Sequence, residues 1–204
     1  MRREYNISDI NPTEDYTILN CIISNGTQAI DTLFYPTNNT SVECDMNLLS
    51  NANKPYPVAC YDLNNRRGYF IGCETPYIAM GYGGVAFINT YITFPINSRN
   101  VLKASFSNGR QTMEKNGSVI YTSTYTGTFS LNTTLSVFAL KKKNNGYDQY
   151  AKMKLYSLKI YDNSILVRNY VPAMKNSDGT IGLLDTLSNT FYQDVKNKTF
   201  DYEK

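Results

Sequence analysis

The stretch of sequence that decides the fold is residues 152–192, KMKLYSLKIYDNSILVRNYVPAMKNSDGTIGLLDTLSNTFY. Polar and apolar residues alternate as far as Leu155, which is typical of a strand with one face in water. The alternation slips by one residue at Leu158, which indicates either a β-bulge or burial of both faces. Asp and Asn at 162–163 favour a tight turn. We expect the return strand after it to end at Pro172 or to lie at a sheet edge, and a smaller hairpin to follow.

Similar patterns recur along the rest of the chain. Residues 41–49 alternate between apolar and polar and predict a half-buried strand, and residues 29–35 predict a short one. Asn-Gly at 116–117, between two apolar segments, is a strong hairpin signal, whereas the apolar run 135–140 predicts a strand buried on both faces. No long stretch combines helical periodicity with caps. We therefore predict an all-β fold, either a sandwich or a barrel.

Composition limits the classes of function. With 204 residues the chain is long enough for one domain, and a net charge of +3 is too small to imply a nucleic-acid partner. The basic run 141–143 is interpreted as a solvated loop rather than a phosphate site. The chain has no His, which excludes Ser-His-Asp and Cys-His catalysis and imidazole metal sites. We expect neither a metal nor a cofactor.

Three further patterns have structural explanations. The four cysteines lack the C-x-x-C spacing of a zinc site and are predicted to be buried free thiols, with disulfides expected only in an oxidising medium: Cys21, Cys44, Cys60 and Cys73. The glycine-rich run 81–84 lacks the Lys-Ser/Thr and the following helix of a phosphate-binding loop. Asp-Asn at 162–163 and Asp-Gly at 178–179 carry oxygens that suit Ca²⁺, but turn formation explains both pairs.

The two ends of the chain differ in pattern from the rest. Residues 1–17 have no sustained periodicity and predict an extended arm, and residues 193–204 predict a polar tail, which leaves 18–192 as the sandwich domain. Residues 4–15 are polar where a signal peptide needs an apolar core, and no apolar run is long enough to cross a bilayer. We therefore expect synthesis in a cytoplasm without a signal peptide, and no membrane insertion.

Three segments carry a family resemblance. The first is ISNGTQAIDT at 23–32, followed by Pro-Thr and Asn-Thr within 36–40; the second is the strand, Asn-Gly, strand pattern within 99–139; the third lies within 159–192. Together they resemble the laminin-G/concanavalin A-like jelly-roll domains of phage virion proteins and gut-bacterial surface proteins. Leu184 departs from the family, which often has an aromatic residue there. The resemblance implies a concanavalin A-like jelly-roll sandwich of two antiparallel sheets with an N-terminal extended arm.

The resemblance, together with the missing catalytic sets, implies a non-enzymatic phage virion protein. It would be a capsid decoration, head-fibre or tail-associated module, located in the virion and made in the host bacterial cytoplasm. Its partners would be other capsid or tail proteins, or further copies of itself, docked through the arm. The arm residues expected to dock are Arg2, Arg3, Tyr5, Ile7 and Ile10.

Two alternatives use the same fold. A carbohydrate-binding adhesin needs aromatic rings beside polar groups that bond to sugar hydroxyls. The residues expected to bind a host-surface glycan are Tyr77, Tyr82, Asn108 and Arg110. A glycoside hydrolase needs two carboxylates flanking the scissile bond. Glu43 and Asp45 begin the strand pattern of such enzymes, but no Glu follows at 47–48, so we interpret both as lining the wet face of a strand.

Overall fold

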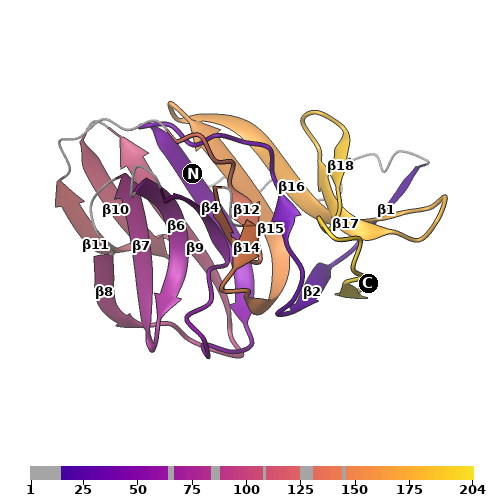
Figure 1. Ribbon diagram of the computed structural model, residues 1–204, viewed down its shortest axis with the longest axis horizontal. Helices are drawn as coiled ribbons and strands as arrows, with labels where there is room; N and C mark the ends of the chain where they lie inside the picture. The colour runs from indigo at the N-terminus through magenta and orange to yellow at the C-terminus, as the bar shows by residue number, and fades with distance from the viewer. Residues whose placement is uncertain (1–14, 64–66, 84–87, 108, 125–130, 144–145) are drawn as a thin grey trace.

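The computed structural model describes residues 15–63, 67–83, 88–107, 109–124, 131–143 and 146–204, except for the side chains at 82–83, and they form an all-β sandwich (Figure 1). Within these residues there is no helix, and therefore none that is long and apolar enough to cross a membrane. The described strands form two sheets, one of eleven strands and one of eight, which confirms the predicted fold class.

The strands of the first sheet are β1 (Tyr16–Ile18), β2 (Cys21–Asn25), β4 (Thr40–Leu48), β9 (Arg99–Ser107), β10 (Arg110–Lys115), β11 (Ser118–Thr124), β15 (Lys152–Asp162), β16 (Ile165–Lys175), β17 (Ile181–Asp185), β18 (Thr190–Tyr192) and β19 (Asp201–Glu203). Those of the second are β3 (Ile30–Asp31), β5 (Val58–Asp62), β6 (Arg67–Glu74), β7 (Tyr77–Gly83), β8 (Ile88–Thr93), β12 (Ser136–Val137), β13 (Leu140–Lys142) and β14 (Gly146–Asp148). Named strands in the described residues pair antiparallel, except β13 with β5.

The centre of the first sheet is β4 and β15, in the order β11-β10-β9-β4-β15-β16-β17-β18. Every second residue of β4 is buried, from Thr40 to Leu48, as the alternation predicts. Its inward side chains meet those of the second sheet in the main hydrophobic core. Tyr69 of β6 spans the two sheets: its ring packs edge-on against Phe106 at 4.9 Å, and its hydroxyl donates to Ala104 O at 3.0 Å. These contacts fix the separation of the two layers.

The slip of alternation in β15 is a β-bulge. The register between β15 and β4 shifts between Leu155 and Ser157, so the bulge accounts for the change of phase. After β15 the chain reverses as predicted, with Asn163 in the left-handed region at φ 50°. Because Asp162 pairs with Thr40, this turn lies at the end of the sandwich where β4 begins.

The prediction that a strand ends at Pro172, or lies there at an edge, is wrong. β16 continues to Lys175, and Pro172 is paired with Leu183 of β17. On its other side β16 is paired with β15 as far as Tyr170 and with β1 from Ala173 onwards. The missing N–H of Pro172 therefore falls where one neighbour replaces the other, and few ladder bonds are lost.

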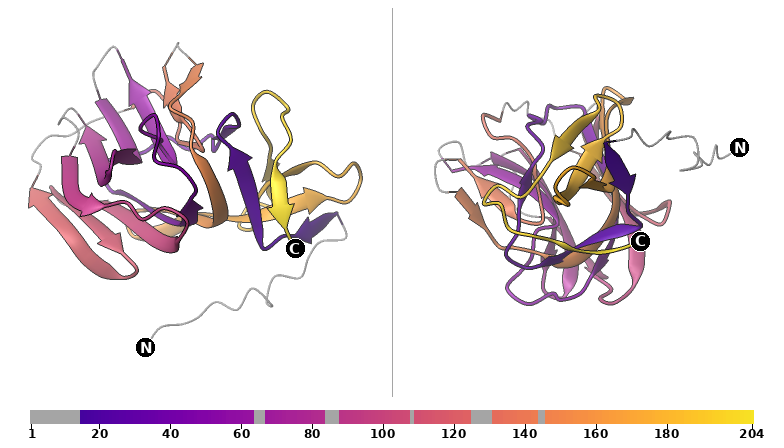
Figure 2. Two further views of the ribbon diagram at one scale, coloured as in Figure 1. Left: turned by 90° about the horizontal axis from the view of Figure 1, so that it is seen from below. Right: turned by 90° about the vertical axis from the view of Figure 1, so that its right-hand side faces the viewer.

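The segments near both ends of the chain lie side by side. β1 and β2 are inserted between β15 and β16 where these two strands diverge, and β19 pairs with the free edge of β2, beside the C label of Figure 2. Phe200 belongs to the main core and is buried. The segment expected to be a polar tail thus contributes a strand and a core residue. Its polar composition conceals this role, because one buried ring and backbone pairing carry the attachment.

The second sheet corrects two strand predictions. The run 135–140 is buried throughout, as predicted, but it is not one strand. Phe138, at φ 71°, reverses the chain between β12, which is antiparallel to β5, and β13, which is parallel to it. Residues 29–35 likewise form only the two-residue strand β3, after which the chain leaves the sheet as a loop. That loop shapes the candidate site.

All four cysteines are buried free thiols, as predicted. Burial raises the pKa of Cys21 and of Cys73 to about 11 and that of Cys60 to about 12, and it raises the pKa of Cys44 as well. The thiolate is the form that binds metals and attacks electrophiles. Cys44 and Cys60 therefore act as small apolar packing groups, whereas the Cys21 thiol donates a hydrogen bond to Glu203 Oε2 at 3.3 Å.

Candidate functional site

The loop between β3 and β4 forms a surface hollow of about 430 Å³, which we call the loop hollow. It is lined by residues 35–39 of the loop, by Leu131, and by Asp162 and Asn163 of the β15–β16 turn. Tyr35 is 56% exposed and offers an aromatic face beside amide and carboxylate groups. An aromatic surface with a few placed polar groups is the usual composition of a small-ligand site.

Side-chain hydrogen bonds to the β15–β16 turn hold the loop in place. Thr37 Oγ1 donates to Asp162 Oδ1, and Asn39 Nδ2 donates to Asn163 Oδ1 at 2.7 Å. Asn163 N also donates to Asn39 O at 3.2 Å. The two side-chain bonds join residues 125 and 124 positions apart in the chain. The polar wall of the hollow is therefore arranged before a ligand arrives, which lowers the ordering cost of binding.

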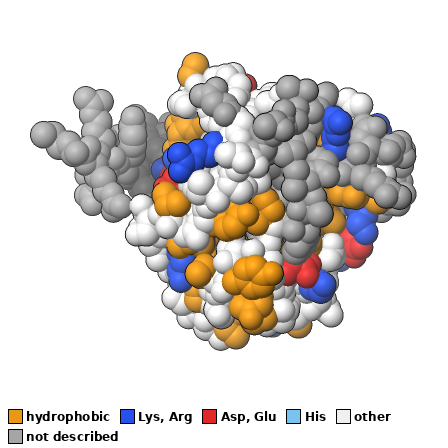
Figure 3. All heavy atoms as spheres, turned by 90° about the vertical axis from the view of Figure 1, so that its left-hand side faces the viewer, with side chains coloured by type: hydrophobic (Ala, Val, Ile, Leu, Met, Phe, Trp, Pro, Cys, Tyr) orange, Lys and Arg blue, Asp and Glu red, His pale blue; other side chains and the backbone are white. Residues whose placement is uncertain are grey.

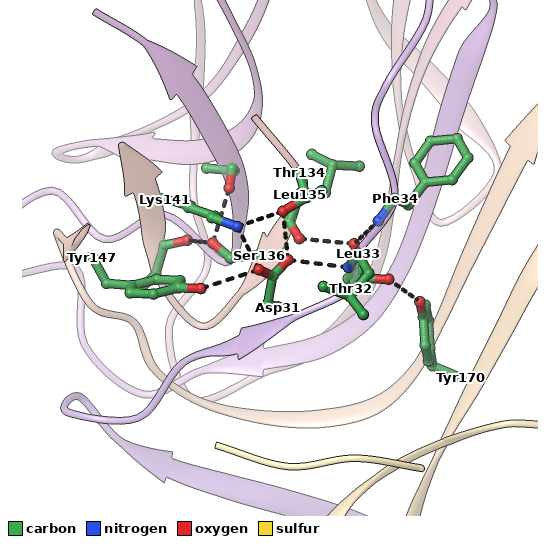
Figure 4. Close-up of polar contacts among 12 residues, drawn as sticks. Asp31, Thr32, Leu33, Phe34, Thr134, Leu135, Ser136, Lys141, Tyr147 and Tyr170 are labelled. Atoms are coloured by element: carbon green, nitrogen blue, oxygen red, sulfur yellow. Dashed lines mark hydrogen bonds and ion pairs between the residues drawn. The ribbon is translucent and has the colours of Figure 1, made fainter. Parts of the chain in front are cut away.

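Asp31 anchors the other end of the loop, and the side chains of Lys141, Tyr147 and Thr134 converge on it (Figure 4). Lys141 forms an ion pair with Asp31 Oδ2, and Tyr147 OH donates to the same oxygen at 3.4 Å. Asp31 Oδ1 accepts hydrogen bonds from Thr134 Oγ1 at 2.6 Å and from Leu33 N at 3.0 Å. This carboxylate thus stabilises Leu33 in its left-handed conformation, φ 55°, from which the chain turns towards the loop hollow.

A buried hydrogen bond also ties the loop to the core. Tyr170 is fully buried, and its ring lies edge-on to Tyr192 at 5.3 Å. Its hydroxyl donates to Thr32 O at 3.1 Å (Figure 4). Burial raises the pKa of Tyr170, so the phenol keeps the proton that it donates. Thr32 Oγ1 donates in turn to Leu135 O at 2.8 Å. The position of the loop is thus determined by the core beneath it.

The positive charges near the loop are paired. The run 141–143 is not the expected solvated loop, because its first two lysines lie in β13 and all three form ion pairs, with Asp31, Asp148 and Asp62 in order. Such pairing disfavours the phosphate interpretation. Asp162 is the charged group among the lining residues of the loop hollow, which include no Lys or Arg.

The residues expected to bind a glycan do not come together. Tyr77 begins β7 at the end of the sandwich where β4 ends. The segment that connects β8 to β9 shows this, because it donates one backbone hydrogen bond to the residue before Tyr77 and another to the last residue of β4. Arg110 begins β10 at the opposite end, where β4 begins. The side chain of Tyr82 and all of Asn108 lie outside the described residues. Tyr77 and Arg110 therefore do not share one small site.

The expected docking residues cannot be placed. The following residues lie outside the described part of the chain: Arg2, Arg3, Tyr5, Ile7 and Ile10. Docking through the arm stays a prediction.

Glu43 and Asp45 lie on the outward face of β4, as predicted, and each is paired with a cation. Asp45 accepts two hydrogen bonds from Arg99, at 2.9 and 2.8 Å, and Glu43 accepts one from Lys159 at 3.2 Å. The Arg99 guanidinium also lies over the ring of Tyr156, 3.9 Å from its centroid. Among the described residues, no group of three or more His, Cys, Asp or Glu is placed to hold a metal ion. The outer sheet face is thus a ladder of paired charges.

Sequence reasoning missed Tyr35 as a site residue and assigned Asn163, together with Asp162, to a turn. Pro36 and Thr37, next to Tyr35, were noted only as part of the first resemblance segment. Those signals concerned turns and strand ends. That the two segments meet is a property of the β4–β15 pairing.

The comparisons with known proteins found likeness in structure but none in sequence. No family model and no curated protein matches the chain. Its structure resembles that of a candidate carbohydrate binding protein from Bacteroides ovatus ATCC 8483, with TM-score 0.66 and 10% identity over 92% of this chain. It also resembles domains LG4-5 of the mouse laminin α1 chain, with TM-score 0.49, 9% identity and 81% coverage of this chain. A third likeness is to the carbohydrate binding module CBM66 from Bacillus subtilis, with TM-score 0.39, 11% identity and 71% coverage.

The chain matches these three structures over different shares of their length. The chain spans 61% of the Bacteroides ovatus protein, 48% of the laminin chain and 92% of the Bacillus subtilis module. Of the three, the first has a TM-score above 0.5, and at its identity it establishes the fold alone. The protein is a laminin-G/concanavalin A-like jelly-roll sandwich, as the resemblance implied.

Proposed function

We propose that this protein is a non-catalytic carbohydrate-binding module that holds a neutral glycan in the loop hollow. The observation that carries the proposal is the exposed ring of Tyr35 beside amide and carboxylate groups that the Asn39–Asn163 and Thr37–Asp162 bonds hold in place. A sugar ring presents an apolar face to an aromatic ring, and its hydroxyls both donate and accept hydrogen bonds. The loop hollow offers both kinds of contact within one concavity.

The charge of the hollow favours a neutral sugar. Asp162 is its charged lining group, and the three lysines of 141–143 are paired with carboxylates. A carboxylate has about four acceptor positions, and Asp162 accepts two side-chain bonds, from Thr37 and Asn163. Its remaining positions suit sugar hydroxyls, whereas a uronic acid would meet like charge.

The likeness to the Bacteroides ovatus protein supports this class of ligand, since that protein is named for carbohydrate binding. The virion role expected from the sequence has no counterpart among these structures and stays a prediction. The hydrolase alternative is disfavoured, because both candidate carboxylates are bonded to cations from neighbouring strands. A reducing-sugar assay tests this point: turnover that vanishes in Glu43→Gln would contradict a non-catalytic protein.

Calorimetric titration with cellohexaose, xylohexaose, mannohexaose and the anionic hexagalacturonate tests the proposal. We expect at least one neutral hexasaccharide to bind at millimolar concentration and hexagalacturonate to bind more weakly. Tyr35→Ala should weaken that binding roughly tenfold, which corresponds to about 1.4 kcal/mol. Tyr35→Phe keeps the ring and should bind like the wild type, as should Tyr202→Ala on the distant strand β19. Unchanged affinity in Tyr35→Ala would overturn the assignment of the site.

A further inference from the structure

A second exposed tyrosine lies at the opposite end of the sandwich, on the edge strand β8. Figure 3 faces the side of the molecule where the edge strands β8 and β11 lie, and it shows hydrophobic side chains gathered on that side. On β8 itself, Tyr91 is 77% exposed and Ile92 is also exposed. Of the large hydrophobic side chains that are exposed in the part of the chain that the structure describes, Tyr91 has the greatest exposure. The core therefore gives no reason for an aromatic residue at this position.

An irregular bulge in β8 presents Tyr91 to solvent. The register of β8 against β7 runs from Thr93 opposite Tyr77 to Asn89 opposite Ala79, so the three residues between Asn89 and Thr93 oppose one residue of β7. Tyr91 N donates to Asn89 Oδ1 at 2.8 Å, and Tyr91 has φ 57°. A non-glycine residue in the left-handed region is strained, and such strain persists where the surroundings impose it.

Further hydrogen bonds maintain the bulge. Thr90 turns inward, and its hydroxyl donates to Ile78 O at 2.8 Å and accepts from Ile92 N at 3.2 Å. A bulge on an edge strand also prevents pairing with another chain, and this role explains the bulge by itself. Protection of the edge requires the bulge but not a tyrosine, because glycine adopts the same φ without strain. The side chain of Tyr91 needs a separate explanation.

A second tyrosine completes a small aromatic platform. The rings of Tyr77 and Tyr91 have centroids 5.8 Å apart and an interplanar angle of 59°. Polar residues flank it, because Tyr77 is paired across the sheet with Thr93 on one side and with Glu74 on the other. Glu74 forms a 2.6 Å ion pair with Lys54. The platform thus has apolar centres, hydroxyl and carboxylate groups at its rim, and a local charge close to zero.

We propose that Tyr77 and Tyr91 form a second carbohydrate-binding site, which takes the ring face of a neutral polysaccharide. The size of the platform favours this occupant over a protein. A stable protein interface buries about 800 Å² on each partner, whereas an aromatic side chain contributes about 150–250 Å². Two rings therefore match one or two sugar units. The amphipathic tyrosine, with two rotatable side-chain angles, also loses little entropy on contact.

The placement of the two sites makes the module bivalent. The loop hollow lies where β4 begins, and the Tyr77–Tyr91 platform lies where β4 ends. One molecule would then hold two polysaccharide chains, or two points of one chain, and gain avidity from the second contact. This inference shares its ligand class with the proposed function, but the platform binds independently of the loop hollow.

Backbone amide NMR of the full chain, titrated with cellohexaose, xylohexaose and mannohexaose to millimolar concentration, separates the two sites. We expect shifts at residues 74–77 and 88–93 as well as at 31–40 and 162–165. Shifts confined to 31–40 and 162–165 would overturn the platform and leave the proposed function intact. Shifts confined to 74–77 and 88–93 would support the platform and overturn the loop hollow. No shifts at either place would overturn both.

Matched variants sharpen the result. Tyr91→Ala should weaken binding at the platform about tenfold while the shifts at 31–40 remain. Tyr91→Phe keeps the ring and should bind within about threefold of the wild type. Tyr77→Ala should behave like Tyr91→Ala, because both rings form the surface. Equal platform binding by Tyr91→Ala and the wild type, with both folded by their amide spectra, would contradict the proposal.

Discussion

The loop that holds Tyr35 and the bulge that holds Tyr91 expose these tyrosines to solvent by different means. The loop of Tyr35 is tied to distant parts of the chain, through Asp162, through Asn163 and through the buried bond from Tyr170. The bulge of Tyr91 is held by bonds within β7 and β8, and Tyr91 itself is strained. The first arrangement makes a shaped concavity, and the second a projecting platform. Hydrogen bonds between distant parts of the chain therefore shape the loop hollow, whereas a locally strained bulge exposes Tyr91.

Truncating Tyr170, which ties the loop of Tyr35 to the core, should have the largest effect on stability. Tyr170→Ala deletes a fully buried ring and its bond to Thr32, so we expect a loss of about 3–5 kcal/mol in the free energy of unfolding. Tyr170→Phe keeps the ring and should cost about 1–2 kcal/mol, because Thr32 O loses its donor. Urea denaturation measures both. A loss in Tyr170→Phe as large as in Tyr170→Ala would show that the hydroxyl, not the packing, dominates.

The Asp31 network should have the next largest effect. Asp31→Asn removes the charge opposite Lys141, and both side chains are largely shielded, at 17% and 23% exposure, so we expect a loss of about 1–3 kcal/mol. Binding at the loop hollow should weaken, while binding at the Tyr77–Tyr91 platform should not change. Asp148→Asn is the control: its ion pair with Lys142 is exposed and should contribute about 0–1 kcal/mol. Equal losses in the two variants, by urea denaturation, would argue against the network as an anchor.

Backbone strain distinguishes the two tyrosines directly. Both Tyr91→Gly and Tyr35→Gly make the unfolded chain more flexible, but Tyr91 alone of the pair has a positive φ. We therefore expect Tyr91→Gly to be the more stable variant by about 1–2 kcal/mol, the usual cost of the left-handed region. Thermal and urea denaturation of the two variants provide the measurement. Equal stabilities would mean that the bulge relaxes without strain.

Thiol labelling should report the smallest difference, the local opening of the β6–β8 region compared with that of the central strand β4. Cys73 pairs with Ile78 beneath the bulge, whereas Cys44 lies in the central strand β4. Burial raises the pKa of both thiols, so little thiolate exists at pH 8 until a segment opens. Mass spectrometry after treatment with a disulfide reagent should find Cys73 labelled before Cys44. Labelling of Cys44 first would place the weakest region at the centre of the sheet.

The same thiols predict a dependence on pH. The folded-state pKa of Cys73 is raised to about 11, against about 8.5 in an unfolded chain. Between these values the unfolded state releases its proton and the folded state does not, so stability falls as pH rises. Cys73→Ala should reduce this alkaline loss of stability, as urea titrations at pH 8 and pH 10 would show. An unchanged slope would mean that the Cys73 thiol is not shielded in the folded protein.

Part of this arrangement could be read from the sequence because it depends on neighbours in the chain. Alternation over 41–49 predicts β4 and its buried face, and Asn-Gly at 116–117 predicts the β10–β11 turn. In that turn Asn116 and Gly117 both have positive φ, 52° and 78°, which those residue types tolerate. The burial of Cys44 follows from the same alternation.

Other features depend on which strands become neighbours. Pro172 lies inside a strand because its partner changes there from β15 to β1, and no local pattern announces that exchange. The bulge that brings Tyr91 beside Tyr77 is a mismatch between two strands, visible only once they are paired. The sequence groups Tyr77 and Arg110 as residues of one expected glycan site, yet the topology places them at opposite ends of the sandwich.

The sequence by itself determined the class of fold, the main strands and the buried thiols, because periodicity and turn chemistry act over a few residues. The tertiary structure decided where a ligand could bind. Thr37 and Asp162 meet across 125 residues through the pairing of β4 with β15, and both line the loop hollow. A strand records in its own residues which face is buried, but the identity of the strand beside it is set by the packing of the whole chain.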